Sequence, residues 1–145
     1  MSEFEKIIGE VKKSKYKKEP KQVIVVRKDL KMRTGKLAAQ VAHASGKVFF
    51  DRAKFSYMHI SIDCTEEMVA WADISKSPFV KIVVYVNSEQ ELHDLKEQAD
   101  ALHIPNALIQ DAGRTEFKEP TYTCLAVGPD DPDFVDEITG DLPLM

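Results

Sequence analysis

The sequence predicts an α/β fold: a single three-layer domain in which helices flank a mixed four-stranded β-sheet. Two near-continuous apolar runs, residues 22–27 and 79–86, are typical of strands that are buried on both faces. Helical patterns separate these runs and the next strand, at 107–110, which indicates right-handed parallel crossovers. The strand expected at 122–127 follows after only about ten residues, too few for a helical return, so we expect it to be antiparallel to a neighbour.

The longest predicted helix follows the first strand. Thr34 is expected to be its N-cap, and the helix should run from Gly35 to about Phe55. Apolar residues at helical spacing form its core-facing stripe, namely Leu37, Val41, Ala44 and Val48.

Capping signals locate two shorter helices. Thr65 is expected to cap a helix that runs through Ala72, because two glutamates follow in a favourable first turn. Ser88 and Glu91 form a capping box at the start of another helix. A last short helix is expected at residues 130–138.

The length of 145 residues suffices to bury one core without disulfides or metal. We expect a domain over residues 21–145, preceded by an extension, residues 1–20, that joins an amphipathic segment to a basic run. Cys64 and Cys124 lack C-x-x-C spacing, which predicts two reduced thiols. The four histidines lack zinc-ligand spacing, so we expect no metal and no cofactor.

No apolar run approaches the roughly 18 residues that a membrane-spanning helix needs. The N-terminus also lacks the apolar core and small-residue cleavage site of a signal peptide. We therefore expect a cytoplasmic protein with no membrane partner.

The charge is unevenly divided along the chain. Residues 1–54 hold 15 Lys and Arg against 6 Asp and Glu, a charge of +9, whereas residues 55–145 hold 5 against 18, a charge of −13. Such an asymmetry indicates a surface for polyanions on an otherwise acidic protein. Phosphate contacts are expected from cations near the long helix, namely Arg27, Lys28, Lys31, Arg33 and Lys47, and from Arg114.

Lys36, Gln40 and His43 recur at helical spacing and therefore share one stripe of the long helix, with Lys47 beyond them. Lys36 lies in the first turn, where the helix dipole is positive, so it should favour an anion or a developing oxyanion as its partner. Asp111 follows a predicted strand. Because ligands gather beyond the carboxyl ends of parallel strands, the two segments are expected to meet in one cleft.

Other interpretations of these residues exist. A strand followed by Gly35 and Lys36 is similar to the phosphate loop of NTPases, but Leu30 and Leu37 stand where that motif needs glycine and Ser or Thr. His43 is equally compatible with a general base and with a packed neutral side chain. Asp111 is also suited to capping its own turn.

The spelling D-L-K-M-x-x-G-K-x-A-A-Q-x-A-H-A, followed by D-A-G-R-T-E, A-V-G-P-D and I-T-G-D-L-P-L, resembles the archaeal and eukaryotic class of peptidyl-tRNA hydrolases, the second class. The resemblance covers residues 21–145. It implies a metal-independent hydrolysis of the ester between a peptide and the 3′ ribose of tRNA. It maps the family's important positions onto Lys36, Gln40, His43, Asp111 and Thr115.

On this resemblance we expect Asp111 to activate or orient water, Lys36 to stabilise charge and Thr115 to supply a hydroxyl. Direct attack by water is preferred, because no Ser-His-Asp or Cys-His constellation stands out. The expected partner is peptidyl-tRNA, and a homodimer is left open beside a monomer. The alternatives are a non-catalytic adaptor module and a tRNA-binding protein without turnover.

Overall fold

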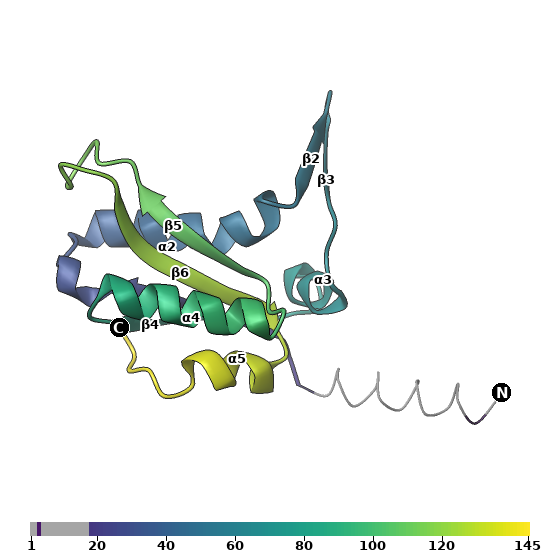
Figure 1. Ribbon diagram of the computed structural model, residues 1–145. Helices are drawn as coiled ribbons and strands as arrows, with labels where there is room; N and C mark the ends of the chain where they lie inside the picture. The colour runs from purple at the N-terminus through teal and green to yellow at the C-terminus, as the bar shows by residue number, and fades with distance from the viewer. Residues whose placement is uncertain (1–2, 4–17) are drawn as a thin grey trace.

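Four strands form the central sheet of the computed structural model, which describes residue 3 and residues 18–145 (Figure 1). The strand order is β4-β1-β6-β5. The strands are β1 (Lys21–Arg27), β4 (Lys81–Val86), β5 (Asn106–Asp111) and β6 (Thr121–Asp130).

The sheet is mixed, as predicted. β1 and β4 are parallel, whereas β6 is antiparallel to both β1 and β5. Consequently β1, β4 and β5 all run in one direction, and their carboxyl ends lie at the same edge of the sheet. The expected antiparallel fourth strand is confirmed, and it lies inside the sheet with a neighbour on each side.

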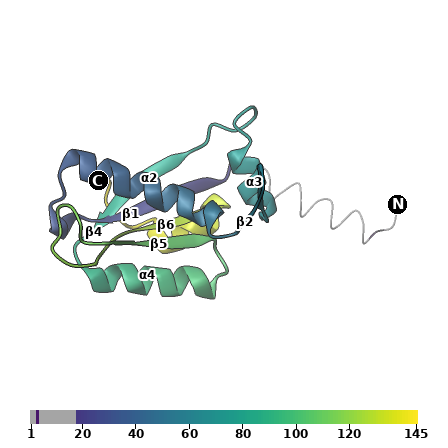
Figure 2. The ribbon, with the colours of Figure 1, turned by 90° about the horizontal axis from the view of Figure 1, so that it is seen from above.

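Helices cover both faces of the sheet, which confirms the three-layer arrangement (Figure 2). α2 (Thr34–Phe50) and α3 (Glu66–Ala72) pack against one face, and α4 (Glu89–Ala101) and α5 (Pro132–Thr139) pack against the other. A short 3-10 helix, η1 (Lys28–Leu30), lies in the connection between β1 and α2.

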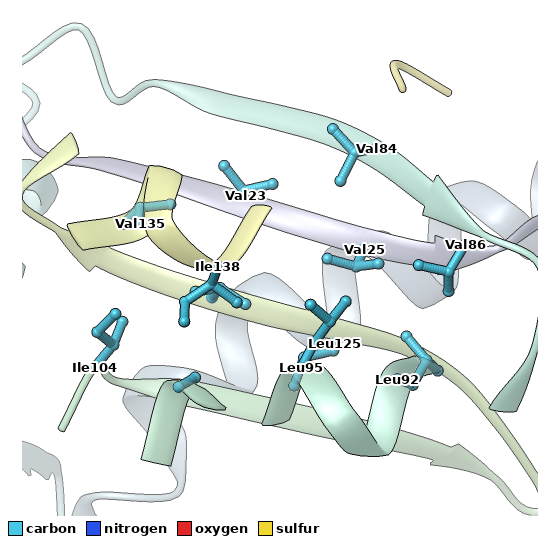
Figure 3. Close-up of a cluster of buried hydrophobic side chains, with 12 residues drawn as sticks. Val23, Val25, Val84, Val86, Leu92, Leu95, Ile104, Leu125, Val135 and Ile138 are labelled. Atoms are coloured by element: carbon cyan, nitrogen blue, oxygen red, sulfur yellow. The ribbon is translucent and has the colours of Figure 1, made fainter. Parts of the chain in front are cut away.

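The two cores follow from the alternation of side chains along the strands. Val23 and Val25 of β1 join the cluster under α4 and α5, which Figure 3 shows. Ile24 and Val26 join the cluster under α2. β1 is therefore apolar at every one of these positions, which is why its sequence gives a continuous apolar run.

The predicted end of the long helix was wrong. α2 ends at Phe50, and residues 53–62 form a separate hairpin of β2 (Ala53–Ser56) and β3 (His59–Ile62) that projects from the body (Figure 1). Its residues alternate between polar and apolar types, a period of two that a helix cannot satisfy. Phe55 and Ile60 pair across one face of the hairpin and are 71% and 55% exposed.

The predicted N-cap was wrong by one residue. Arg33 is the N-cap of α2, and Thr34 is its first helical residue. The other two caps are confirmed: Thr65 accepts a hydrogen bond from the Met68 N–H, and Ser88 accepts one from the Glu91 N–H.

Both cysteines are free thiols, as expected, and Cys124 is buried in β6. In the described part of the chain, no helix has the length and apolar character to cross a membrane. The amphipathic segment and most of the basic run expected at residues 1–17 lie outside the described residues, apart from residue 3.

Candidate active site

An open pocket of about 850 Å³ lies at the edge of the sheet where β1 and β5 end. The N-terminal end of α2 and the loop at 112–120 form its walls, and both views place these two segments side by side (Figures 1 and 2). The residues that line it are Arg33, Lys36, Ala39, Gln40, His43, Asp111, Ala112, Arg114, Thr115 and Glu116.

The pocket is organised around an ion pair between two distant segments. The Lys36 Nζ atom lies 2.5 Å from the Asp111 Oδ1 atom, and the two side chains are 13% and 11% exposed. Lys36 is in the first turn of α2, where the helix dipole disfavours a cation, so the carboxylate offsets a field that the helix itself creates. The two groups therefore hold each other charged in a largely desolvated position.

Thr115 completes this contact. The Lys36 ammonium also donates to the Thr115 Oγ1 atom, at 2.6 Å. Because the hydroxyl oxygen accepts from lysine, the hydroxyl proton is left to point elsewhere. These two contacts use two of the three N–H donors of the ammonium, so one donor remains for a ligand.

The loop holds Asp111 from its other side. The Gly113 N–H donates to the Asp111 Oδ2 atom at 2.9 Å, so each carboxylate oxygen has a donor. Gly113 has a φ of +80°, and a Cβ there would lie 2.5 Å from the backbone carbon of Glu119. Only glycine fits this tight turn, which fixes the direction of the Asp111 carboxylate. The expected turn-capping role of Asp111 is thus present together with its contact to Lys36.

These contacts determine the charge of Asp111. The hydrogen bond from Lys36 lowers the pKa of this carboxyl below its ordinary value. Desolvation opposes that effect, while the Gly113 N–H and the positive charge of Lys36 reinforce it. Asp111 is therefore an anion near neutral pH.

His43 lies at the rim of the pocket and is exposed. The alternative of a packed side chain within the core is therefore wrong. Its exposure follows from the helical stripe, because Ala44, the next residue, is the one that enters the core.

Two polar residues that the sequence did not single out take part in the site. Thr123 of β6 is fully buried, and its hydroxyl donates to the Gln40 Oε1 atom at 2.5 Å. Glu116 accepts the Arg33 N–H, at 3.3 Å to Oε1, and thereby caps α2 from the opposite wall. The motif D-A-G-R-T-E contains Glu116, but only the folded loop brings its carboxylate to the helix.

The cations expected to meet phosphate are not gathered in one place. Arg33, with an 89% exposed side chain, and Arg114 line the pocket. Lys28 and Lys31 line a separate hollow of about 430 Å³. Lys47 lies further along α2 and pairs with the aspartate four residues on, at 2.6 Å.

Arg27 differs from the other cations because it is largely buried and lies near two carboxylates. Its guanidinium lies 2.8 Å from Asp29 and 3.9 Å from Glu89, and it donates to the Tyr122 carbonyl at 3.1 Å. The side chain is 12% exposed. The structure therefore gives Arg27 a bracing position between β1, β6 and α4.

The described residues contain no cluster of three or more His, Cys, Asp or Glu side chains arranged to hold a metal ion. The functional groups of the pocket are instead an ammonium, two guanidinium groups, two carboxylates, an amide, a hydroxyl and an exposed imidazole. This combination can bind an anionic ligand, orient water and donate hydrogen bonds to an oxygen that gains negative charge.

Comparison with known proteins places this chain in a family. The sequence model of the family Peptidyl-tRNA hydrolase PTH2 matches residues 20–145. A peptidyl-tRNA hydrolase of Thermococcus sibiricus is 43% identical over 125 residues, which cover 86% of this chain and 97% of that protein. One from Methanopyrus kandleri is 45% identical over 125 residues, with the same coverage. One from Sulfurisphaera tokodaii is 42% identical over 125 residues, covering 86% and 98%.

The ion pair predicts a measurable shift at Asp111. In a carbon-detected NMR titration, its carboxyl should titrate below about 3.9, the ordinary aspartate value, and Lys36→Met should move the pKa upward. Because the folded pKa is lowered, the stability from the pair is present above that ordinary value and is lost as the pH falls through the lowered one.

Lys47→Met is the matched control, since it removes a cation from the same helix that pairs with another aspartate. It should leave the Asp111 titration in place. An unchanged Asp111 pKa in Lys36→Met would show that the ion pair is not the cause of the shift.

Proposed function

Because this chain belongs to the PTH2 family of peptidyl-tRNA hydrolases, we propose that the Lys36–Asp111–Thr115 network is its catalytic centre. The reaction is hydrolysis of the ester between a peptide and the 3′ ribose of tRNA, which returns the tRNA for use. The observation that carries the assignment is the ammonium held between a carboxylate and a hydroxyl in an open pocket.

The reaction needs three things from the protein. The oxygen of a water molecule bonds to the ester carbonyl carbon, the carbonyl oxygen gains negative charge, and the bond to the ribose oxygen then breaks. One water proton ends on the ribose oxygen. The site must therefore orient the water, stabilise the oxyanion and move a proton.

Asp111 orients the attacking water in this proposal. Its lowered pKa makes it a weak base, so accepting a hydrogen bond suits it better than keeping a proton. The Lys36 and Gly113 donors each occupy one carboxylate oxygen and leave further lone pairs that water can use.

Lys36 stabilises the oxyanion in the same proposal. Its side chain is 13% exposed, and a charged donor that is largely shielded from solvent acts more strongly than one in bulk water. Thr115 supplies a hydroxyl whose proton is not used by Lys36, so it can donate to the water or to the leaving oxygen. Gln40 and His43 support this centre from the next two turns of α2.

The proposed tRNA surface consists of the exposed cations around the pocket. Arg33 and Arg114 line the pocket itself, and Lys28, Lys31 and Lys47 extend the surface away from it. Within this proposal Arg27 braces the loop that carries Lys28 and Lys31, since it is largely buried and lies near two carboxylates. Such contacts recognise phosphate irrespective of sequence.

We further propose that residues 21–145 form the catalytic domain and that residues 1–20 are an extension. Action in the cytoplasm fits a substrate that translation produces. A homodimer is also proposed, and the exposed apolar face of the β2–β3 hairpin supports it. Light scattering, which gives the molar mass in solution, tests the proposed homodimer.

Lys36→Met and Asp111→Asn should each lower kcat by about 100-fold or more, the scale of losing one charge-stabilising or acid–base group. Release of N-blocked peptide from charged tRNA measures this. Lys21→Met is the control, because it breaks an ion pair with Asp136, 2.6 Å away, at the opposite end of β1. It should keep full activity.

Thr115→Val and His43→Ala should show smaller losses, and a chelator should leave turnover unchanged. Near-native activity in a folded Asp111→Asn variant would remove Asp111 from the catalytic centre. Activity that a chelator abolishes would contradict the metal-independent mechanism.

Binding of tRNA should weaken steeply with salt, because phosphate contacts release counterions. Replacing Arg33 and Arg114 by Gln should reduce the slope of log K against log salt by roughly one to two. Lys96→Gln, on α4 across the sheet, should leave the slope unchanged. Binding indifferent to salt would exclude the proposed surface.

Deleting residues 1–17 tests the extension. The deletion keeps Lys18, whose ammonium donates to Asp133 at 2.8 Å. Turnover on a short RNA that carries an N-blocked aminoacyl ester should be unchanged, and affinity for full-length tRNA should at most decrease. Loss of turnover on both substrates would place these residues within the catalytic domain.

A further inference from the structure

Next to the pocket, the side chains of β6 stop alternating between the two faces of the sheet. Ile109 of β5 pairs with Cys124, yet the following residue, Gln110, pairs with Tyr122, so Thr123 is an extra residue in the ladder. Tyr122 packs against the core under α4, and Cys124 belongs to the core under α2. Thr123 also contacts α2, so two consecutive residues face the same side of the sheet. A β-bulge has this effect: it turns a side chain to the other face.

Both residues hold Gln40. The Thr123 hydroxyl donates to the Gln40 Oε1 atom at 2.5 Å, and the Cys124 thiol donates to the Gln40 carbonyl at 3.2 Å. Thr123 and Cys124 are fully buried, and Gln40 is 3% exposed. Burial raises the pKa of the Cys124 thiol to about 12, so the thiol keeps its proton as a donor. The bulge thus fixes both the backbone and the side chain of one residue of α2.

The orientation of the Gln40 amide follows from its two neighbours. The Nε2 atom lies 3.5 Å from the Asp111 Oδ1 atom, which is an acceptor because the carboxyl is ionised. The reversed amide would place its carbonyl oxygen against that anion and its N–H groups against Thr123. The Thr123 hydroxyl stabilises the observed orientation by donating to the carbonyl oxygen. The amide N–H groups therefore point towards the pocket.

We propose that Thr123 is a positioning residue: the β-bulge turns its hydroxyl onto Gln40, which fixes the Gln40 amide as a hydrogen-bond donor to the ester carbonyl oxygen. The amide nitrogen and the Lys36 ammonium both lie next to the Asp111 Oδ1 atom, so the two donors converge on one region of the pocket. In this arrangement Gln40 and Lys36 both donate hydrogen bonds to the oxyanion. This assignment rests on the proposed function.

Thr123→Val removes the hydroxyl and keeps the shape of the side chain. Its kcat for peptidyl-tRNA should fall by about 10- to 100-fold, below the usual loss of a whole oxyanion donor, while KM should stay within about threefold because the ground state is bound as before. Thr123→Ser should restore most of kcat. The matched control is Thr139→Val, which removes a buried hydroxyl in α5 that donates to the Val135 carbonyl at 3.1 Å. It should reduce stability and leave kcat unchanged.

A double-mutant cycle separates positioning from packing. If Thr123 acts through Gln40, Thr123→Val should lower kcat by less than about twofold in a Gln40→Met background. An equal loss in both backgrounds, or a full loss in Thr123→Ser, would overturn the proposal. So would wild-type kcat in Thr123→Val.

NMR of the Gln40 side-chain amide gives a readout that does not require turnover. In the wild type its N–H protons should be slow to exchange with solvent, and Thr123→Val should make them exchange faster. Fast exchange in the wild type would overturn the proposal even if Thr123→Val did not fold. A wild type that fails to hydrolyse peptidyl-tRNA, but shows protected amide protons, would refute the proposed reaction and retain the orientation of Gln40.

Discussion

The ion pair between Lys36 and Asp111 is the interaction on which the site depends. It joins the first turn of α2 to the end of β5, two segments 75 residues apart. Each charge is unfavourable without the other, since the ammonium faces the positive end of a helix dipole and the carboxylate is largely removed from water. The pair therefore holds these two side chains in place without a ligand, which in the proposed mechanism is the condition for electrostatic stabilisation of an oxyanion.

The topology of the sheet makes this pair possible. Because β6 lies between β1 and β5 and is antiparallel to both, those two strands run the same way and end at one edge. The loop after β5 folds back over that edge through the tight turn at Gly113, and Glu116 then caps α2. The sheet also supports the pocket directly, because Thr123 and Cys124 of β6 contact Gln40.

Among the described residues, cations of the first half and many acidic residues of the second half lie on different elements. Exposed cations surround the pocket or extend along α2, while α4 and α5 carry many of the acidic residues of the second half. In the proposed binding mode, a strongly anionic tRNA is attracted to the first surface and repelled from the second, which orients the encounter before specific contacts form. The β2–β3 hairpin departs from this pattern, since Phe55, Tyr57, Met58 and Ile60 expose apolar surface at the far end of α2.

The sequence by itself determined what depends on local periodicity and on chain length. Helical spacing placed Lys36, Gln40 and His43 on one stripe, and the short connection before β6 required an antiparallel strand. Only the tertiary structure decided the capping of α2 by Glu116, the pairing of Arg27 with Glu89, and the turn of Thr123 towards Gln40. The physical reason is that these features depend on partners distant in sequence. A bulge depends on how two strands pair, and Thr123 alone carries no sign of which face of the sheet its hydroxyl will meet.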